Sequence, residues 1–255
     1  DKTSTSIARG FIENDSFSKI ENIFQSGSSW NNIHWGSRLM FKDNLLYASI
    51  GERGYGSVAQ DPASYFGKMI RINKDGTAPK DNPYSMNEDW LPEIYQIGLR
   101  NPQGIMLYPN DSEIYITNHG PRGGDFFGKV EAGTNYGWAD VAWGGIDYDG
   151  SIIGDGSAWK EGLLKPIYTW VPSIAVSDMT FYGGDLFPEL KNKILVTSLK
   201  AQRLISLEFD GKKARNETTL FEKVGRVRNV ETNSAGEIYV IIDNEDSGIW
   251  KLVNK

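Results

Sequence analysis

Short apolar runs separated by Gly, Asn and Asp turns make up most of the chain. Six of them, rich in Ile, Val, Leu and Tyr, predict strands at 45–50, 68–72, 113–117, 194–197, 204–209 and 237–242. No stretch keeps a helical period of apolar residues over three turns, so we expect only a short helix at 57–66 and another near Leu163. The pattern predicts an all-β protein.

The strand runs belong to a loose repeat. Four segments begin in a turn, continue through an apolar strand and end in polar residues: KDNLLYASIGERG, NDSEIYITNHGPRG, LKNKILVTSLKAQR and SAGEIYVIIDNEDSG. Their starts lie about 45 to 80 residues apart, which favours the blades of a β-propeller with inserted loops over a two-sheet sandwich. We therefore expect residues 1–255 to form a single propeller domain, with the functional site where polar strand ends meet at one mouth of its channel.

Polar residues at those strand ends are the candidate functional residues: His34, Arg38, Glu52, Arg53, Arg100, Asn101, His119, Gly120, Pro121, Lys200, Arg226 and Arg228. Four cations among them, Arg100, Lys200, Arg226 and Arg228, would suit a ligand with several carboxylates or phosphates if they shared a cavity. Arg226 and Arg228 alternate along a strand, so both side chains are expected on one face. A solvated strand face balanced by nearby acids is the alternative interpretation of that pair.

Two further features could take part in chemistry. A neutral imidazole at His34, with an ordinary pKa of ~6.5, can take a proton from a hydroxyl group, although a packed histidine beside Trp35 is the alternative. The segment 118–125 contains three glycines and a proline and can present backbone carbonyls inward. Carbonyl oxygens suit calcium, but an ordinary tight turn is equally compatible with this segment.

Composition excludes several classes of protein. The net charge of −6, without a block of Lys and Arg, argues against nucleic-acid binding, and no apolar run is long enough to span a membrane. The absence of cysteine excludes thiolate nucleophiles, disulfides and iron–sulfur sites, and two histidines cannot form a three-His metal site. The chain also lacks the glycine-rich and nucleophile motifs of serine hydrolases, NTPases and nicotinamide enzymes.

Taken together, the motifs resemble those of the soluble pyrroloquinoline quinone (PQQ) dependent aldose sugar dehydrogenases, relatives of soluble PQQ glucose dehydrogenase. The matching stretches occur in family order over nearly the whole chain: HWGSRLMF (34–41), GKMIRINKDG (67–76), DNPY (81–84), GLRNPQG (98–104), NHGPRGGD (118–125), GTNYGW (133–138), SLK (198–200) and RVRNV (226–230).

The resemblance implies a six-bladed propeller in which PQQ and calcium support oxidation of the anomeric hydroxyl of an aldose to the lactone. It places the general base at His34 and a charge-stabilising residue at Arg100, and it places sugar contacts at Trp35 and Trp170. The implied cofactor-binding residues are Arg100, Asn101, His119, Lys200, Arg226 and Arg228, and the implied calcium ligands are the carbonyls of Gly120 and Pro121. Electrons would pass to an external quinone, cytochrome or dye, in a periplasmic or secreted protein.

The chain also departs from the family pattern. Family members are longer at the amino end, so we expect most of the first blade to be missing here. Asn118 replaces a usual Glu, which makes a second, structural calcium doubtful, and Asp178 replaces a Gly, where we expect an altered turn. Two alternatives to the dehydrogenase are a non-catalytic sugar-binding or interaction module and a calcium-dependent lactonase. The basic candidate residues disfavour the lactonase, and neither the aldose nor the electron acceptor follows from the sequence.

Overall fold

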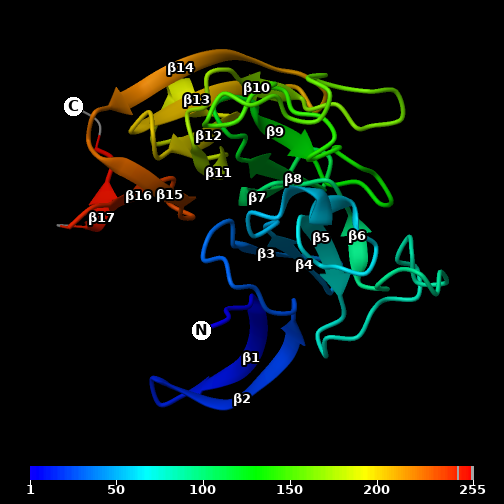
Figure 1. Ribbon diagram of the computed structural model, residues 1–255. Coiled ribbons are helices and arrows are strands. Elements are labelled where there is room, and N and C mark those ends of the chain that lie inside the picture. The colour runs from blue at the N-terminus through cyan, green and yellow to red at the C-terminus, as the bar shows by residue number, and fades with distance from the viewer. Residues whose placement is uncertain (246, 254–255) are drawn as a thin grey trace. The chain divides into compact units, whose positions relative to one another are not determined.

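The computed structural model describes residues 1–245 and 247–253, and its regular secondary structure is almost entirely antiparallel sheet (Figure 1). This confirms the all-β prediction. The chain divides into two units: Asp1–Asn101 with Glu131–Ala139 form unit 1, and Pro102–Val130 with the chain from Asp140 onward form unit 2. Among the described residues, no helix has the length and apolar character needed to cross a membrane.

Unit 1 contains two sheets. The hairpin pairs β1 (Ser6–Glu13) with β2 (Ser16–Gln25). The second sheet is a meander of four strands in chain order: β3 (Gly36–Lys42), β4 (Leu45–Ile50), β5 (Lys68–Ile72) and β6 (Ile94–Gln96). A short 3-10 helix, η1 (Gly56–Gln60), lies in the connection between β4 and β5.

Unit 2 contains three sheets. The first has the strands β7 (Pro102–Tyr108), β8 (Glu113–Asn118), β9 (Asp125–Lys129) and β10 (Tyr168–Trp170). The second has β11 (Val176–Tyr182), β12 (Lys193–Ser198), β13 (Arg203–Phe209) and β14 (Ala214–Glu222), with a 3-10 turn, η2 (Pro188–Leu190), between β11 and β12. The third has β15 (Arg226–Thr232), β16 (Ile238–Asp243) and β17 (Gly248–Lys251).

All six predicted strands are present, within two residues at each end, as β4, β5, β8, β12, β13 and β16. The predicted helix at 57–66 is reduced to η1, and the prediction of a helix near Leu163 is wrong, because residues 161–167 form turns and irregular backbone. Gly162, with a φ of 88°, adopts the left-handed conformation that glycine tolerates and that interrupts a right-handed helix.

Apolar side chains on the sheet faces form cores between neighbouring sheets. In unit 1, Ile7 and Phe24 of the hairpin pack against Leu46, Ile50 and Ile70 of the meander. In unit 2, one core lies between the first two sheets and another between the second and the third. Within unit 2 the leading strands β7, β11 and β15 are neighbours, so consecutive sheets stack on each other in chain order.

Stacked four-stranded meanders whose leading strands are adjacent are typical of propeller blades. The structure therefore agrees with the propeller class. The number of six blades, the single domain over 1–255 and the missing first blade stay predictions.

Candidate functional site

The predicted site residues fall into two groups, one on each unit. Unit 1 carries His34, Trp35, Arg100 and Asn101, and unit 2 carries His119, Gly120, Pro121, Trp170, Lys200, Arg226 and Arg228. Each group has its own supporting contacts, and each is described on its own.

His34 precedes β3 and is oriented by a buried acid. Its Nδ1 forms a short hydrogen bond to Oε1 of Glu52, and the second oxygen of Glu52 accepts the backbone N–H of Gly56 at 2.7 Å. The Glu52 side chain is 1% exposed, whereas that of His34 is 17% exposed. Within the described part of the chain, Nε2 of His34 has no hydrogen-bond partner. An imidazole held through Nδ1 by a carboxylate keeps its other nitrogen free to accept a proton.

Close backbone packing fixes this pair. A Cβ atom on Gly51 would lie 1.9 Å from the carbonyl oxygen of His34, so only glycine permits the approach. His34 itself has a φ of 50°, in the left-handed region. The glycine after β4 thus brings the His34 segment against the strand end that carries Glu52.

Arg100 and Asn101 reach the same place from the segment after β6. The backbone N–H of Glu52 donates to the carbonyl of Arg100 at 2.9 Å, and the Asn101 side-chain oxygen accepts the N–H of Gly36 at 3.1 Å. The Arg100 guanidinium lies over the ring of Trp138, 5.4 Å from its centroid. Both Arg100 and Asn101 are buried. Unit 1 therefore brings together a histidine, its carboxylate partner, an arginine and an asparagine.

Trp35 has one ring face covered by Arg53, whose guanidinium is 3.5 Å from the ring centroid. Nη2 of Arg53 donates to the Thr3 hydroxyl at 2.6 Å and to the Asn31 carbonyl at 2.5 Å. Burial lowers the pKa of Arg53. The predicted sugar contact at Trp35 would have only the other face of the indole available.

In unit 2, Asp125 organises the loop that contains Gly120 and Pro121. This fully buried carboxylate accepts the N–H of Gly120 at 2.8 Å, the Ser173 hydroxyl at 2.9 Å and the N–H of Ala175 at 2.7 Å. Burial raises the pKa of Asp125, and these hydrogen bonds oppose that rise. The tight turn needs glycine, because a Cβ on Gly120 would lie 2.1 Å from the carbonyl oxygen of Gly123. Gly120 and Pro121 are buried and His119 is half-buried.

Arg226 and Arg228 share one acid partner. Nη2 of Arg228 lies 2.5 Å from Oδ2 of Asp243, and Nε of Arg226 lies 3.7 Å from the same oxygen. Val227 between them is fully buried, which confirms that the two arginines lie on one face of the strand. The neighbouring guanidinium groups lower the pKa of Asp243, and the hydrogen bond from Arg228 has the largest effect. Both arginines keep substantial exposure, and Lys200 is exposed.

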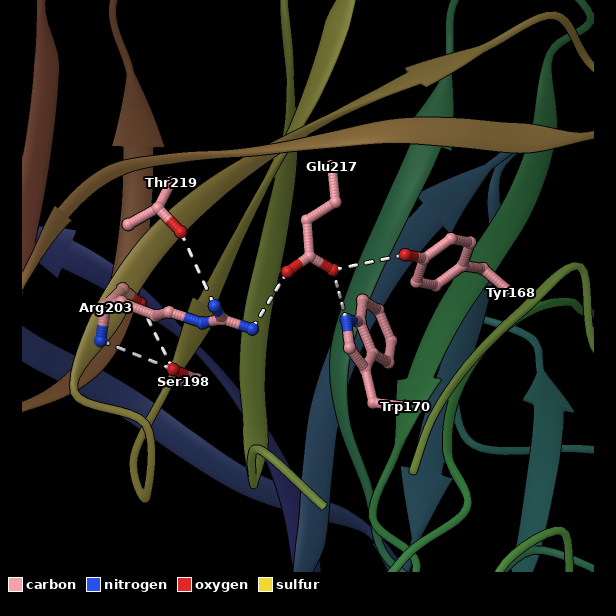
Figure 2. Close-up of polar contacts among 6 residues, drawn as sticks. All are labelled: Tyr168, Trp170, Ser198, Arg203, Glu217 and Thr219. Carbon is pink, nitrogen blue, oxygen red and sulfur yellow. Dashed lines mark hydrogen bonds and ion pairs between the residues drawn. The ribbon is translucent and has the colours of Figure 1, made fainter. Parts of the chain in front are cut away.

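Trp170, the other predicted sugar contact, is buried in a polar cluster (Figure 2). Its indole N–H donates to Glu217 at 2.7 Å, and the Tyr168 hydroxyl donates to the same carboxylate at 3.3 Å. Arg203 completes the cluster with an ion pair of 2.8 Å to Glu217. The Trp170 carbonyl also accepts the N–H of Gly124 at 2.8 Å. These contacts give Trp170 a packing and loop-holding role.

Over the described residues, no group of three or more His, Cys, Asp or Glu side chains is placed to hold a metal ion. Asp125, the acid nearest the Gly120 turn in sequence, is occupied by backbone and hydroxyl donors. A cation at this loop would depend on backbone carbonyl oxygens.

Glu52 is among the residues that the sequence singles out, and the family resemblance puts Asp125 alongside the implied calcium ligands, but the sequence does not predict the contacts by which these two acids organise the groups. Glu52 was visible as a polar residue directly after a buried strand, but its pairing with His34 depends on a contact 18 positions away. Asp125 carried no signal that separates a buried carboxylate from an exposed one. Only the fold shows that its acceptors face the Gly120 turn.

Known proteins resemble this chain over most of its length. The family model for glucose/sorbosone dehydrogenases matches residues 1–251. Aldose sugar dehydrogenase YliI of Escherichia coli (strain K12) is 34% identical over 222 residues, which cover 86% of this chain and 60% of that protein. Quinoprotein glucose dehydrogenase B of Acinetobacter calcoaceticus is 31% identical over 185 residues, which cover 62% of this chain and 37% of that protein.

The solved structures agree. The crystal structure of a glucose dehydrogenase superposes with a TM-score of 0.95 at 30% identity, covering 100% of this chain and 75% of that one. The chain spans about three fifths of the length of the E. coli relative. From the family match and this superposition, the chain belongs to the glucose/sorbosone dehydrogenase family.

Proposed function

We propose that this chain acts as a PQQ- and calcium-dependent dehydrogenase that oxidises the anomeric hydroxyl of aldose sugars to the lactone. The observation that carries the proposal is the His34–Glu52 pair, in which a buried carboxylate holds one imidazole nitrogen and the other has no hydrogen-bond partner among the residues that the structure describes. A quinoprotein glucose dehydrogenase and an aldose sugar dehydrogenase among the relatives support the same reaction class.

His34 is the proposed general base. Oxidation of a cyclic aldose at the anomeric carbon removes the hydroxyl proton together with the C–H hydrogen and its electron pair. Nε2 of His34 takes the hydroxyl proton, and the Glu52 carboxylate stabilises the imidazolium that forms. PQQ, when bound, supplies the acceptor for the electron pair. The two electrons then leave to an external quinone, cytochrome or dye.

Arg100 is the proposed charge-stabilising group. A guanidinium remains positively charged at every physiological pH, and a buried one interacts strongly with negative charge that develops on a nearby oxygen. The Trp138 ring holds the Arg100 guanidinium in place, and the hydrogen bond from the Glu52 N–H to the Arg100 carbonyl fixes the Arg100 backbone. We assign Asn101 to cofactor binding on the family resemblance alone.

The cations of unit 2 fit a ligand with several carboxylates. PQQ is a tricarboxylate, and Lys200, Arg226 and Arg228 are accessible to solvent. Asp243 already occupies the arginine pair, so a ligand carboxylate must replace it or share the two guanidinium groups with it. His119 joins this group on the family resemblance.

The calcium part of the proposal depends on the carbonyls of Gly120 and Pro121. Carbonyl oxygens are suitable ligands for calcium, and Asp125 holds the Gly120 turn in a fixed shape. The donor set near this turn contains no free carboxylate from Asp125, so calcium would need further oxygens from its ligand or from water.

Further parts of the proposal follow the family: a six-bladed propeller, a periplasmic or secreted location, and a sugar contact at Trp35. The buried Trp170, whose indole N–H is bound by Glu217, is assigned to packing instead. The competing function is a non-catalytic sugar-binding or interaction module. The intact His34–Glu52 pair favours the enzyme, because a binding module has no need of a proton acceptor.

The test is reduction of a dye by the purified protein, with glucose as substrate and with PQQ and calcium added together or singly. Methyl glucoside is the matched control, since its anomeric oxygen carries no proton and cannot yield the lactone. The proposal predicts dye reduction with glucose, none with methyl glucoside, and dependence on both additions. Binding of glucose without any dye reduction would establish the binding module instead.

A further inference from the structure

Lys68 is a buried cation with a complete set of backbone acceptors. It begins β5, its residue is 0% exposed, and its Nζ lies 2.9 Å from each of three carbonyl oxygens, those of Val58, Ala59 and Phe66. An ammonium group has three N–H donors, so each donor has one acceptor. Burying a charge is costly unless it is hydrogen-bonded in this way. The site has the form of a bound cation whose coordination comes entirely from backbone carbonyls.

The three carbonyls identify what Lys68 holds. Val58 and Ala59 belong to η1, and Phe66 lies in the segment that leads into β5. The ammonium therefore ties the last turn of η1 to the start of the strand. An uncharged side chain of similar length could not donate to these three buried carbonyl oxygens. Each of them would lose one hydrogen bond.

The first residue of η1 contacts the acid that orients the candidate base. Gly56 donates its N–H to Oε2 of Glu52 at 2.7 Å, and Oε1 of Glu52 binds Nδ1 of His34. The position of the η1 backbone therefore determines whether both oxygens of Glu52 are engaged, and through them how the imidazole is oriented.

The last residue of η1 touches the support of Arg100. The Gln60 amide donates to the Trp138 carbonyl at 2.6 Å, and its oxygen accepts from the Asn135 side chain at 2.7 Å. The Trp138 ring lies against the Arg100 guanidinium. One 3-10 turn therefore contacts the supports of both candidate catalytic groups of unit 1.

We propose that Lys68 is a positioning residue for His34 and Arg100, and that it acts through η1 by fixing its carbonyls with an ammonium group. The claim that Lys68 matters for catalysis rests on the proposed function. The claim that Lys68 positions the His34 and Arg100 side chains does not, because it can be tested in the protein without cofactor or substrate. The two claims can therefore fail independently.

The experiment reads the His34 imidazole directly in the unliganded protein. Only two histidines are present, so 15N-histidine labelling gives two imidazole spin systems, and the variant His119→Gln assigns them. A second sample with 15N-tryptophan shows the indole N–H signals, and Trp138→Phe assigns that of Trp138. At pH 7 the wild type should show His34 with its proton on Nδ1. Lys68→Met should produce a second His34 signal set with the proton on Nε2, together with a shifted Trp138 indole signal.

Two variants separate positioning from a general loss of stability. Met69→Ala truncates a side chain that is as fully buried as Lys68, at the next position of β5, where the side chain points to the other face of the sheet. Lys80→Met makes the same chemical change at an exposed residue of unit 1. Both should keep a single His34 tautomer, even where the thermal midpoint of Met69→Ala falls as far as that of Lys68→Met.

The absence of cysteine allows a chemical rescue. Lys68→Cys can be alkylated under denaturing conditions to S-aminoethylcysteine, which restores an ammonium at nearly the original length, or to S-propylcysteine, which is uncharged. Wild type carried through the same refolding is the reference. The proposal predicts that the ammonium form regains the single tautomer and the propyl form does not. If both forms behave alike, or if Lys68→Met leaves the His34 and Trp138 signals unchanged, the proposal is overturned, whatever the outcome of the dye assay.

Discussion

His34 and Glu52 form a pair in which the buried carboxylate has two different donors, the imidazole Nδ1 on one oxygen and the Gly56 amide on the other. Glutamine at position 52 offers one acceptor oxygen and one NH₂ group, so it cannot accept from both donors. Glu52→Gln should therefore lower kcat/KM for the aldose by about 10²-fold, the scale of a general base that has lost its orienting partner.

The measurement is steady-state dye reduction, with PQQ binding followed separately. Glu88→Gln is the matched control, because Glu88 lies exposed on a loop of the same unit. Equal activity of Glu52→Gln and wild type would show that the carboxylate does not orient the base.

Gly51 sets the distance between the His34 segment and the end of β4. In Gly51→Ala the new Cβ would lie 1.9 Å from the His34 carbonyl oxygen, so the backbone must move apart. We expect the free energy of unfolding to fall by about 1–3 kcal/mol, as for overpacking elsewhere, and the single His34 tautomer to be lost. Chemical denaturation and the imidazole signals measure the two effects.

Gly248→Ala is the control for that change, because a Cβ there has its nearest neighbour at 3.8 Å. It should be close to neutral in both readouts. A stable Gly51→Ala protein with an unchanged His34 signal would contradict the packing argument.

Trp170 is expected to contribute stability and leave sugar affinity unaffected. Trp170→Phe keeps an aromatic ring but removes the N–H that donates to Glu217. A hydrogen bond to a charged group contributes about 1.5–3 kcal/mol, so the free energy of unfolding should fall by an amount of that order. The KM for the aldose should stay within about twofold of wild type.

Thermal or denaturant unfolding and aldose titration check this prediction, and Trp30→Phe, at a 70% exposed indole, is the control. A large rise in KM without a loss of stability would restore Trp170 as a sugar contact.

The sequence predicted the fold better than it predicted the site, for physical reasons. Strands such as β4 and β13 are short buried runs bounded by turn residues, so the residues of the strand and its flanking turns are enough to predict them. The same locality made the two arginines of β15 predictable, because alternation along a strand decides which face a side chain takes.

The supporting contacts depend on pairings between distant segments. Local sequence patterns contain nothing that joins Glu52 to His34, or Lys68 to η1, because each contact depends on how a loop folds back on a strand end. Asp178 illustrates the difference. An altered turn was expected there, but the residue lies within β11, buried, where its carboxylate accepts from the Asn229 side chain and from the N–H of Val230.

The central claim is that His34 removes the anomeric proton. It is tested most directly by loading wild type and His34→Gln with PQQ and calcium, confirming equal PQQ binding, and following reduction of the bound cofactor by glucose in anaerobic stopped-flow. The account predicts that the rate falls by about 10²- to 10⁴-fold in His34→Gln. Equal PQQ binding with reduction rates within a few-fold of each other would contradict it.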